Sequence, residues 1–442
     1  MRSRLTTPLL LALFATLAVA QKKSAPRVHF TEHQLDNGLR VILVEDHAAP
    51  VVSMSVTYNA GSRDEQKGRT GFAHLFEHMM FQGSENVGKG EHFVLVEKNG
   101  GSMNGTTNAD RTNYYESLPA NQLDLGLFLE ADRMRALAVT PANFENQRKT
   151  VKEERQQNYD NRAYGRSMEA LHELMYDGFA YQHSTIGSMA DLDAASVDDA
   201  RAFFKTYYAP NNAVLTLVGD FLPADALTRI KKHFGEIPAQ KAPPVPDMGE
   251  PDQEKERRAV LEDPLARMTR IDVAMKIPAG NHADFLPLQA VASILGGGRS
   301  SRLHHAAVEE KQIAQSIGAF AMERRGTGVL QISALVRPGH TAAELETLGS
   351  GEIARLLEPK SIEDWELDKV RAQARRRSAE QQRGSLSRAV AIGEYAVLFD
   401  DPDLINRRPE LVAKITKEDV QRVARKYLAP GRRNVLITER PQ

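Results

Sequence analysis

Two histidines and a glutamate interrupt an apolar stretch at residues 71–84, GFAHLFEHMMFQGS. His74 and His78 stand four residues apart, so on a helix both imidazoles leave the same face, one turn apart, and can bind one metal ion. Histidine and carboxylate ligands suit zinc, and a catalytic zinc needs three protein ligands and a fourth position for water. Glu77 is next to one of these histidines and could reach that water, so we expect it to act as general base.

Chance or a solvated helix face could also produce this motif. In a chain with 13 histidines and abundant acids, a chance H-x-x-E-H has a probability on the order of a few in a hundred. Against a solvated face, the neighbours are apolar, and burying three polar groups without partners would cost several kcal/mol. Those neighbours are Phe72, Leu75, Phe76, Met79 and Met80. A metal ion accounts best for the polar groups.

The segments around the motif predict an α+β fold. Residues 33–65 alternate in hydrophobicity on both sides of Asp36-Asn37-Gly38, which indicates two strands joined by a turn. Residues 71–80 and 122–138 have helical spacing of apolar residues. Between these two segments, residues 100–119 are first rich in Gly, Asn and Thr and then in Thr and Tyr, as expected of a turn that leads into a strand.

An internal repeat predicts two similar domains. Residues 196–220 and 416–440 share Asp, Tyr, Ala and Pro at a constant offset of 220, and both begin with a helix-capping box and end in an expected strand. Between the repeats, residues 237–257 contain five prolines and many charges, which is typical of a linker. We therefore expect an N-terminal metal-binding domain at 21–240, a linker at 241–257 and a C-terminal domain at 258–442.

The chain resembles the pitrilysin, insulinase and mitochondrial processing peptidase family of zinc metallopeptidases. HLFEH is the inverted zincin motif. Further blocks that are similar to the family, in the family's order, are LDNGLRVILVEDHAAPVV, GSRDE, GFAHLFEHMMFQGS, MNGTTNADRTNYY, VKEERQQNYDNRAYG, IGSMADL and YYAPNNAVLTLVGDF. The resemblance covers nearly all of the expected mature chain. It implies a zinc endopeptidase shaped as a half-clam, built from two α+β domains of mostly antiparallel sheet with packed helices.

The same resemblance implies the remaining ligand and one Zn²⁺ per chain. In this family the third ligand is a glutamate some 76 residues beyond the second histidine, in a V-x-x-E pattern, and Val151 and Glu154 stand at these positions. Glu153 is the competing residue, but its side chain would leave the helix about 100° away. The ligand set implied by the resemblance is therefore His74, His78 and Glu154.

Two further positions follow from the resemblance. Asn104 matches a family position that helps to hold the substrate backbone beside an exposed strand, although Asn104-Gly105 could equally form a type I′ turn. Gln147 stands where several members carry a glutamate that supports the site. Because an amide cannot raise ligand basicity as a carboxylate does, we expect Gln147 to lower the metal affinity.

The second domain lacks the family's electrophilic pair. Members carry an arginine and a tyrosine seven residues apart that stabilise the tetrahedral intermediate, and the aligned residues here are Val308 and Gln315. We therefore expect a partner, a zinc-free homologous subunit that supplies Arg and Tyr, more than a homodimer. The expected function is hydrolysis of peptides or unfolded segments in a chamber closed by that subunit. The alternative is a non-catalytic assembly or peptide-binding subunit.

The N-terminal sequence predicts where the protein is located, and the composition excludes some classes of function. Arg2 and Arg4 precede an apolar run and the small-x-small sequence Ala18-Val19-Ala20, which predicts a signal peptide at 1–20 and a periplasmic or secreted protein. The apolar run is shorter than the ~20 residues of a membrane span, which argues against an anchor, and no later segment is long enough. With 57 basic residues, 58 acidic residues and no cysteine, the chain shows no preference for nucleic acid and has no disulfide or thiolate chemistry.

Overall fold

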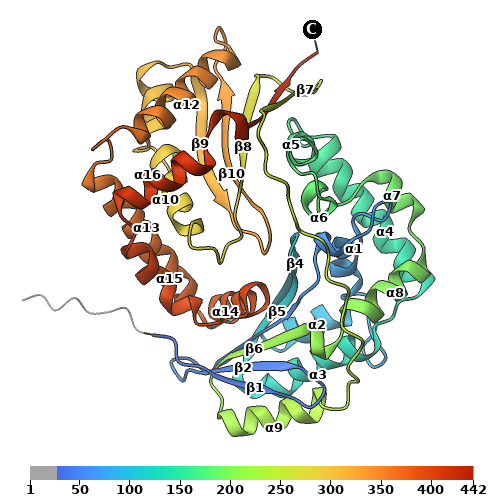
Figure 1. Ribbon diagram of the computed structural model, residues 1–442. Coiled ribbons are helices and arrows are strands. Elements are labelled where there is room, and N and C mark those ends of the chain that lie inside the picture. The colour runs from blue at the N-terminus through green and yellow to red at the C-terminus, as the bar shows by residue number, and fades with distance from the viewer. Residues whose placement is uncertain (1–26, 442) are drawn as a thin grey trace, which may run out of the picture.

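The computed structural model describes residues 27–441 as two lobes that face each other, each built on one β-sheet (Figure 1). The expected signal peptide at 1–20 lies outside the described residues. Among residues 27–441, none of the helices has the length and apolar character that a bilayer-spanning segment requires.

The first sheet has six strands in the order β1-β2-β6-β3-β5-β4. Their bounds are Thr31–Gln34 for β1, Arg40–Glu45 for β2, Val51–Tyr58 for β3, Ser102–Thr107 for β4, Thr112–Pro119 for β5 and Ala213–Gly219 for β6. Neighbouring strands are antiparallel except β2 and β6, which are parallel. The turn predicted at residues 36–38 joins β1 to β2, and Gly38 has φ of +87°, which a side chain would disfavour. Strand β4 lies at one edge of the sheet.

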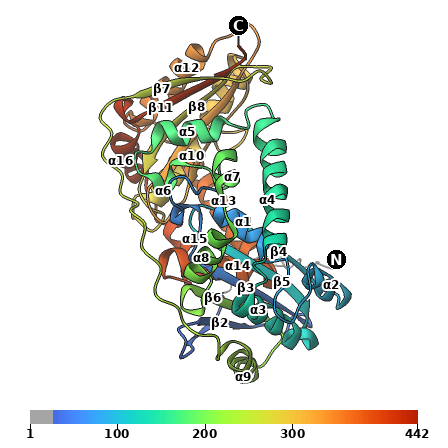
Figure 2. The ribbon, with the colours of Figure 1, turned by 90° about the vertical axis from the view of Figure 1, so that its right-hand side faces the viewer.

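Helices cover one face of this sheet and form the first core. They are α1 (Phe72–Met79), α2 (Glu91–Lys98), α3 (Leu123–Ala136), α4 (Pro141–Arg155), α8 (Val197–Tyr207) and α9 (Pro223–Phe234), with the short α6 (Phe179–Gln182) and α7 (Met189–Ala194) nearby. Alternate strand residues such as Met54, Val56 and Tyr58 point into this core, as the two-residue period of a strand requires. Helix α4 stands beside α1, as Figure 2 shows.

The second sheet repeats the first. Its order is β7-β11-β8-β10-β9, with bounds Arg257–Glu262, Asn434–Glu439, Arg270–Ile277, Gly328–Val336 and Ala314–Met322, respectively. Again one pair, β7 and β11, is parallel and the rest are antiparallel. The accompanying helices are α10 (Phe285–Gly296), α11 (Arg302–His304), α12 (Ala342–Leu357), α13 (Asp364–Arg383), α15 (Leu404–Ala413) and α16 (Lys417–Tyr427). The predicted α+β fold of two duplicated domains is confirmed.

The repeat is visible at single positions. Helix α16 begins and ends 220 residues after α8, and the capping boxes predicted from sequence are formed in both. In the first, the Ser196 hydroxyl accepts from the amide of Asp199; in the second, Thr416 does the same for Asp419. The limits of the two domains stay a prediction. Residues 238–256, which contain most of the expected linker, hold no helix or strand, although Glu250 anchors them by accepting hydrogen bonds from Gly178 and Lys276.

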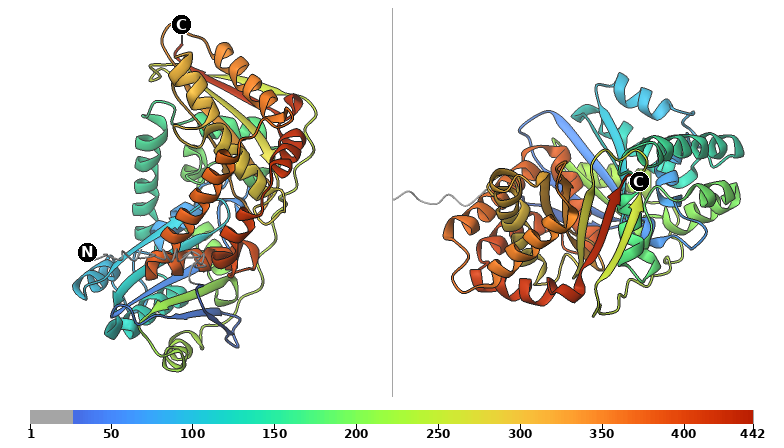
Figure 3. Two further views of the ribbon diagram at one scale, coloured as in Figure 1. Left: turned by 90° about the vertical axis from the view of Figure 1, so that its left-hand side faces the viewer. Right: turned by 90° about the horizontal axis from the view of Figure 1, so that it is seen from above.

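Each lobe lends one helix to the other. Helix α5 (Ser167–Met175) packs on β7, β8 and β11 of the second sheet, where Leu171 and Met175 meet Ala274, Val329 and Leu436. In return, α14 (Ser385–Phe399) packs on β3, β5 and β6 of the first sheet. Figure 1 shows both helices in the opposite lobe, and Figure 3 shows the two lobes from two further sides. These exchanged helices hold the lobes in one arrangement.

Candidate zinc centre

Helix α1 carries the H-x-x-E-H motif with its apolar side against the first sheet. Phe72, Leu75, Phe76 and Met79 are buried there, which leaves the histidines on the other side of the helix. The helix begins after Gly71, whose φ of +88° suits glycine, and a Cβ atom at this position would lie 2.7 Å from the Ile186 carbonyl oxygen. Sequence spacing and local backbone therefore agree on where α1 starts.

A remote carboxylate caps the N-terminus of α1. The helix has no side-chain cap of its own, and Glu65 instead accepts hydrogen bonds from the amides of Gly71 (2.9 Å) and Ala73 (2.8 Å). Glu65 is buried, and its Oε2 lies 3.0 Å from Nε2 of His183. Burial raises the pKa of Glu65 while His183 opposes the rise. A negative group at this end of a helix is stabilised by the helix dipole.

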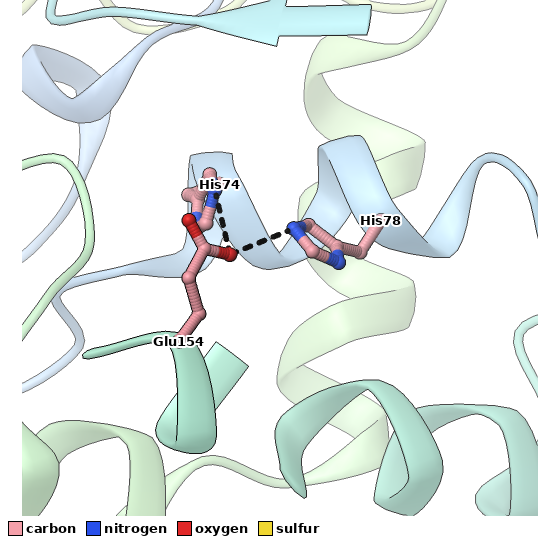
Figure 4. A group of neighbouring side chains, drawn as sticks. All are labelled: His74, His78 and Glu154. Carbon is pink, nitrogen blue, oxygen red and sulfur yellow. Dashed lines mark ion pairs between the residues drawn. The ribbon is translucent and has the colours of Figure 1, made fainter. Parts of the chain in front are cut away.

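The structure brings His74, His78 and Glu154 together (Figure 4). One oxygen of Glu154, which α4 supplies, lies 3.4 Å from Nε2 of His78 and 3.8 Å from Nε2 of His74. Ligand atoms held tetrahedrally at the usual zinc distances are about 3.3 Å apart, so this group fits a zinc ion with little movement. Glu153 is exposed on another side of α4. A π-helical segment, Gln156–Asp160, follows α4 immediately, as is frequent near functional sites.

The electrostatics of His74 favour metal binding. Burial, with a smaller contribution from His78, lowers the pKa of His74 to about 4. The imidazole is therefore neutral at ordinary pH, which is the form that binds a metal ion. Its Nδ1 atom is buried without a hydrogen-bond partner among the described residues.

Glu77 of α1 lies against strand β4. Its side chain is half-buried, and a Cβ atom added at Gly105 of β4 would lie 3.2 Å from its Cγ atom. Burial raises the pKa of Glu77, which the Thr107 hydroxyl and His78 oppose. A carboxylate with a raised pKa is a better general base, because proton transfer to it is more favourable. Both the position of Glu77 beside β4 and its raised pKa therefore suit proton transfer to a peptide bound at this strand.

Asn104 lies in β4, opposite Tyr115 of β5. The type I′ turn considered for Asn104-Gly105 is wrong, because both residues are part of an extended strand, and the chain turns later, between β4 and β5. Asn104 is exposed, and its side-chain oxygen accepts a hydrogen bond of 2.8 Å from the amide of Gly105. The outer edge of β4 has no neighbouring strand among residues 27–441, so it can receive an extended peptide.

The remaining predicted residues lie farther from the motif. Gln147 is buried on α4, and its amide donates to Asn146; no hydrogen bond joins it to the three grouped residues in the described chain. Val308 is half-buried in the π-helical segment His305–Glu310, and Gln315 is exposed on β9. Neither Val308 nor Gln315 can provide the charge of an arginine or the phenol of a tyrosine.

Sequence reasoning missed a second group, His92, Glu116 and Glu130, which lies wholly in the first core. Arg133 donates two hydrogen bonds to Glu130, stacks 4.5 Å from the Tyr114 ring centroid and is itself buried. Burial and Glu130 raise the pKa of Glu116, and burial lowers that of His92. The guanidinium already supplies the positive charge here, so this group is a buried charge network. Only the three-dimensional contacts reveal it.

Comparisons with known proteins agree with this geometry. A family model described as insulinase, peptidase family M16, matches residues 40–188, and one described as peptidase M16 inactive domain matches residues 194–374. The chain belongs to the M16 peptidase family. The M16 inactive-domain match covers most of the second lobe, where the sequence has no H-x-x-E-H.

Several M16 proteins are similar over most of the chain. Zinc protease PqqE of Helicobacter pylori is 31% identical over 400 residues, which is 89% of each chain. The crystal structure of a protease from Helicobacter pylori superposes with a TM-score of 0.89 at 28% identity, covering 94% of this chain and 100% of that one. The periplasmic protease PqqL of Escherichia coli shares the fold, with a TM-score of 0.77 at 19% identity; 95% of this chain matches 48% of PqqL.

Proposed function

We propose that this M16 chain is a zinc-dependent endopeptidase that acts on peptides or unfolded protein segments. The observation that carries the proposal is the approach of Glu154, from α4, to His74 and His78 on α1. Glu77 lies beside β4, whose outer edge pairs with no strand among residues 27–441. His74, His78 and Glu154 would hold one zinc ion per chain. When bound, zinc polarises the substrate carbonyl and acidifies water.

The protein's own residues bind the substrate and transfer the proton. A substrate strand pairs with the outer edge of β4, with Asn104 helping to hold its backbone, so that the scissile carbonyl lies near Glu77. Glu77 accepts a proton from the attacking water and returns it to the leaving nitrogen, so no net proton is consumed. The pairing of β4 with β5 holds the edge strand in place for that contact.

We propose that hydrolysis takes place in a closed chamber, and that a second subunit is needed to close it. In PqqL, this chain matches about half the length, which supports a functional unit twice the size of this chain. Because Val308 and Gln315 lack the required groups, we propose a zinc-free homologue that presents Arg and Tyr toward Glu77. The similarity to a periplasmic protease, together with the signal peptide expected at 1–20, supports a periplasmic or secreted location.

The decisive experiment is Glu77→Gln. We expect hydrolysis of unstructured peptides to be abolished while about one zinc per chain is retained, because Glu77 transfers protons and is not a ligand. Unchanged hydrolysis would refute this role. A dialysed protein without zinc would favour the alternative, a non-catalytic peptide-binding or assembly subunit.

A further inference from the structure

A cavity of about 520 Å³ lies between the two lobes and is lined by both. On the first lobe, Asn108 directly follows β4, and Tyr159 belongs to the π-helical segment after α4. The cavity therefore begins where β4 ends. Gly105, beside Glu77, is three residues before Asn108, a distance of roughly 10 Å along an extended chain.

The acids on the cavity wall are all engaged in ion pairs. Each has an arginine partner within ion-pair distance. The pairs are Asp110 with Arg63, Glu169 with Arg155, Glu323 with Arg408, and Glu394 with Arg111. A cationic substrate would therefore have to compete with an arginine for each of these carboxylates.

Two arginines on the wall have no acid. In the part of the chain that the structure describes, Arg324 and Arg377 form no ion pair, although both line the cavity. Arg377 is exposed on α13. Arg324 is only 5% exposed, and among residues 27–441 its guanidinium makes one hydrogen bond, to the Met322 sulfur at 3.6 Å. These two guanidiniums are therefore the cations on the described wall that an anionic ligand could pair with.

The guanidinium of Arg324 has hydrogen-bond donors that an anion could use. Its guanidinium lies 4.5 Å from the ring centroid of Tyr181 and 5.5 Å from that of Tyr176. Its Nε atom is buried and has no hydrogen-bond partner within residues 27–441. Aromatic faces compensate part of the loss of water around a cation, but they do not use its N–H donors. A buried arginine without a carboxylate is unfavourable unless a ligand supplies one.

We propose that Arg324 and Arg377 form an acid-selective subsite for peptide substrates, which binds an aspartate or glutamate side chain three or more residues from the scissile bond. The place of this subsite along the substrate rests on the proposed function, since it assumes a peptide paired with β4. The distance from Gly105 to Asn108 sets the minimum spacing, and the unpaired guanidiniums set the chemistry.

The test measures binding, so that it does not depend on turnover. The zinc-loaded full chain carrying Glu77→Gln is titrated against fluorescent peptides of one length that differ only by Glu or Gln at a scanned position, at low and moderate salt. We expect about tenfold tighter binding of the Glu peptide at a position three to five residues to one side of the scissile bond, from one charge-assisted hydrogen bond. This preference should weaken with added salt.

Variants locate the preference. Arg377→Gln and Arg324→Gln should each reduce it, while Arg375→Gln, a matched change at an exposed α13 residue that does not line the cavity, should leave it intact. Because Arg377 is exposed, its substitution tests the subsite even if Arg324→Gln fails to fold. Equal binding of Glu and Gln peptides, or a preference that survives Arg377→Gln unchanged, would overturn the proposal. A preference for acid in a wild-type chain that hydrolyses nothing even after the zinc-free homologue is added would instead refute the endopeptidase function and leave the subsite standing.

Discussion

His183 Nε2 lies 3.0 Å from the Glu65 carboxylate, which in turn accepts the amides of Gly71 and Ala73 at the start of α1. A residue more than a hundred positions away thus orients the cap of the helix that carries both histidines. The position of α1 and the negative charge at its N-terminus therefore depend on the contact between His183 and Glu65.

Glu65→Gln should weaken zinc binding. The amide keeps one acceptor oxygen but loses the negative charge at the helix N-terminus, so we expect zinc affinity to fall about tenfold, as for other supports of metal ligands. Competition with a chelating dye measures the affinity. Asp199→Asn, which removes a capping carboxylate from α8, is the control and should lower thermal stability without changing zinc affinity. Equal zinc affinity in Glu65→Gln and wild type would contradict a positioning role.

Glu154→Gln and Glu153→Gln form a matched pair for the third ligand. The two residues are adjacent on α4, but only Glu154 faces the histidines. We expect Glu154→Gln to lose bound zinc on dialysis and Glu153→Gln to keep about one equivalent, because an amide is a poor zinc ligand. Elemental analysis checks both. Zinc retention by Glu154→Gln would show that another residue completes the site.

Addition of a zinc-free homologue with Arg and Tyr should raise peptide hydrolysis at least tenfold. Each oxyanion donor usually contributes on the order of 10²–10³ in rate, and Val308 and Gln315 do not provide the required pair. The measurement is kcat/KM during titration of the partner, with a partner lacking Arg and Tyr as control. Full activity of the purified single chain would mean that the donors come from elsewhere in this chain.

His172 should make stability fall in mild acid. Burial, with a smaller effect of Arg324, lowers its pKa from 6.5 to about 3. Because the folded pKa is depressed, the stabilisation is present above pH 6.5 and is lost as the pH falls below that value, by about 2 kcal/mol between pH 7 and pH 5.

Urea unfolding of the zinc-free protein measures this change. His172→Phe keeps an aromatic ring but cannot titrate, so the free energy of unfolding should decline less over this range. The measurement is made without zinc so that His74 contributes equally to the pH dependence of unfolding in wild type and in His172→Phe. Parallel curves for the two proteins would show that His172 does not set the pH dependence.

The sequence predicted features that depend on near neighbours. Helix α1, the turn at Gly38 and the paired capping boxes each depend on residues a few positions apart. Glu154 lies far from His78 in the chain, so only the family resemblance placed it beside the histidines. The cap by Glu65 and the stacking of Arg324 depend on distant segments that meet only after folding, and no local pattern marks them.

The exchange of α5 and α14 also determines how the molecule can be divided. A fragment ending in residues 238–256 would keep a sheet whose Ile42, Val44 and Val218 had lost their cover, and a helix with no sheet to cover. Cutting the chain there would therefore not release two independently folding units, because the sheet of each half is covered by a helix of the other half. The polypeptide has the layout of an intertwined dimer joined end to end, with one helix exchanged in each direction.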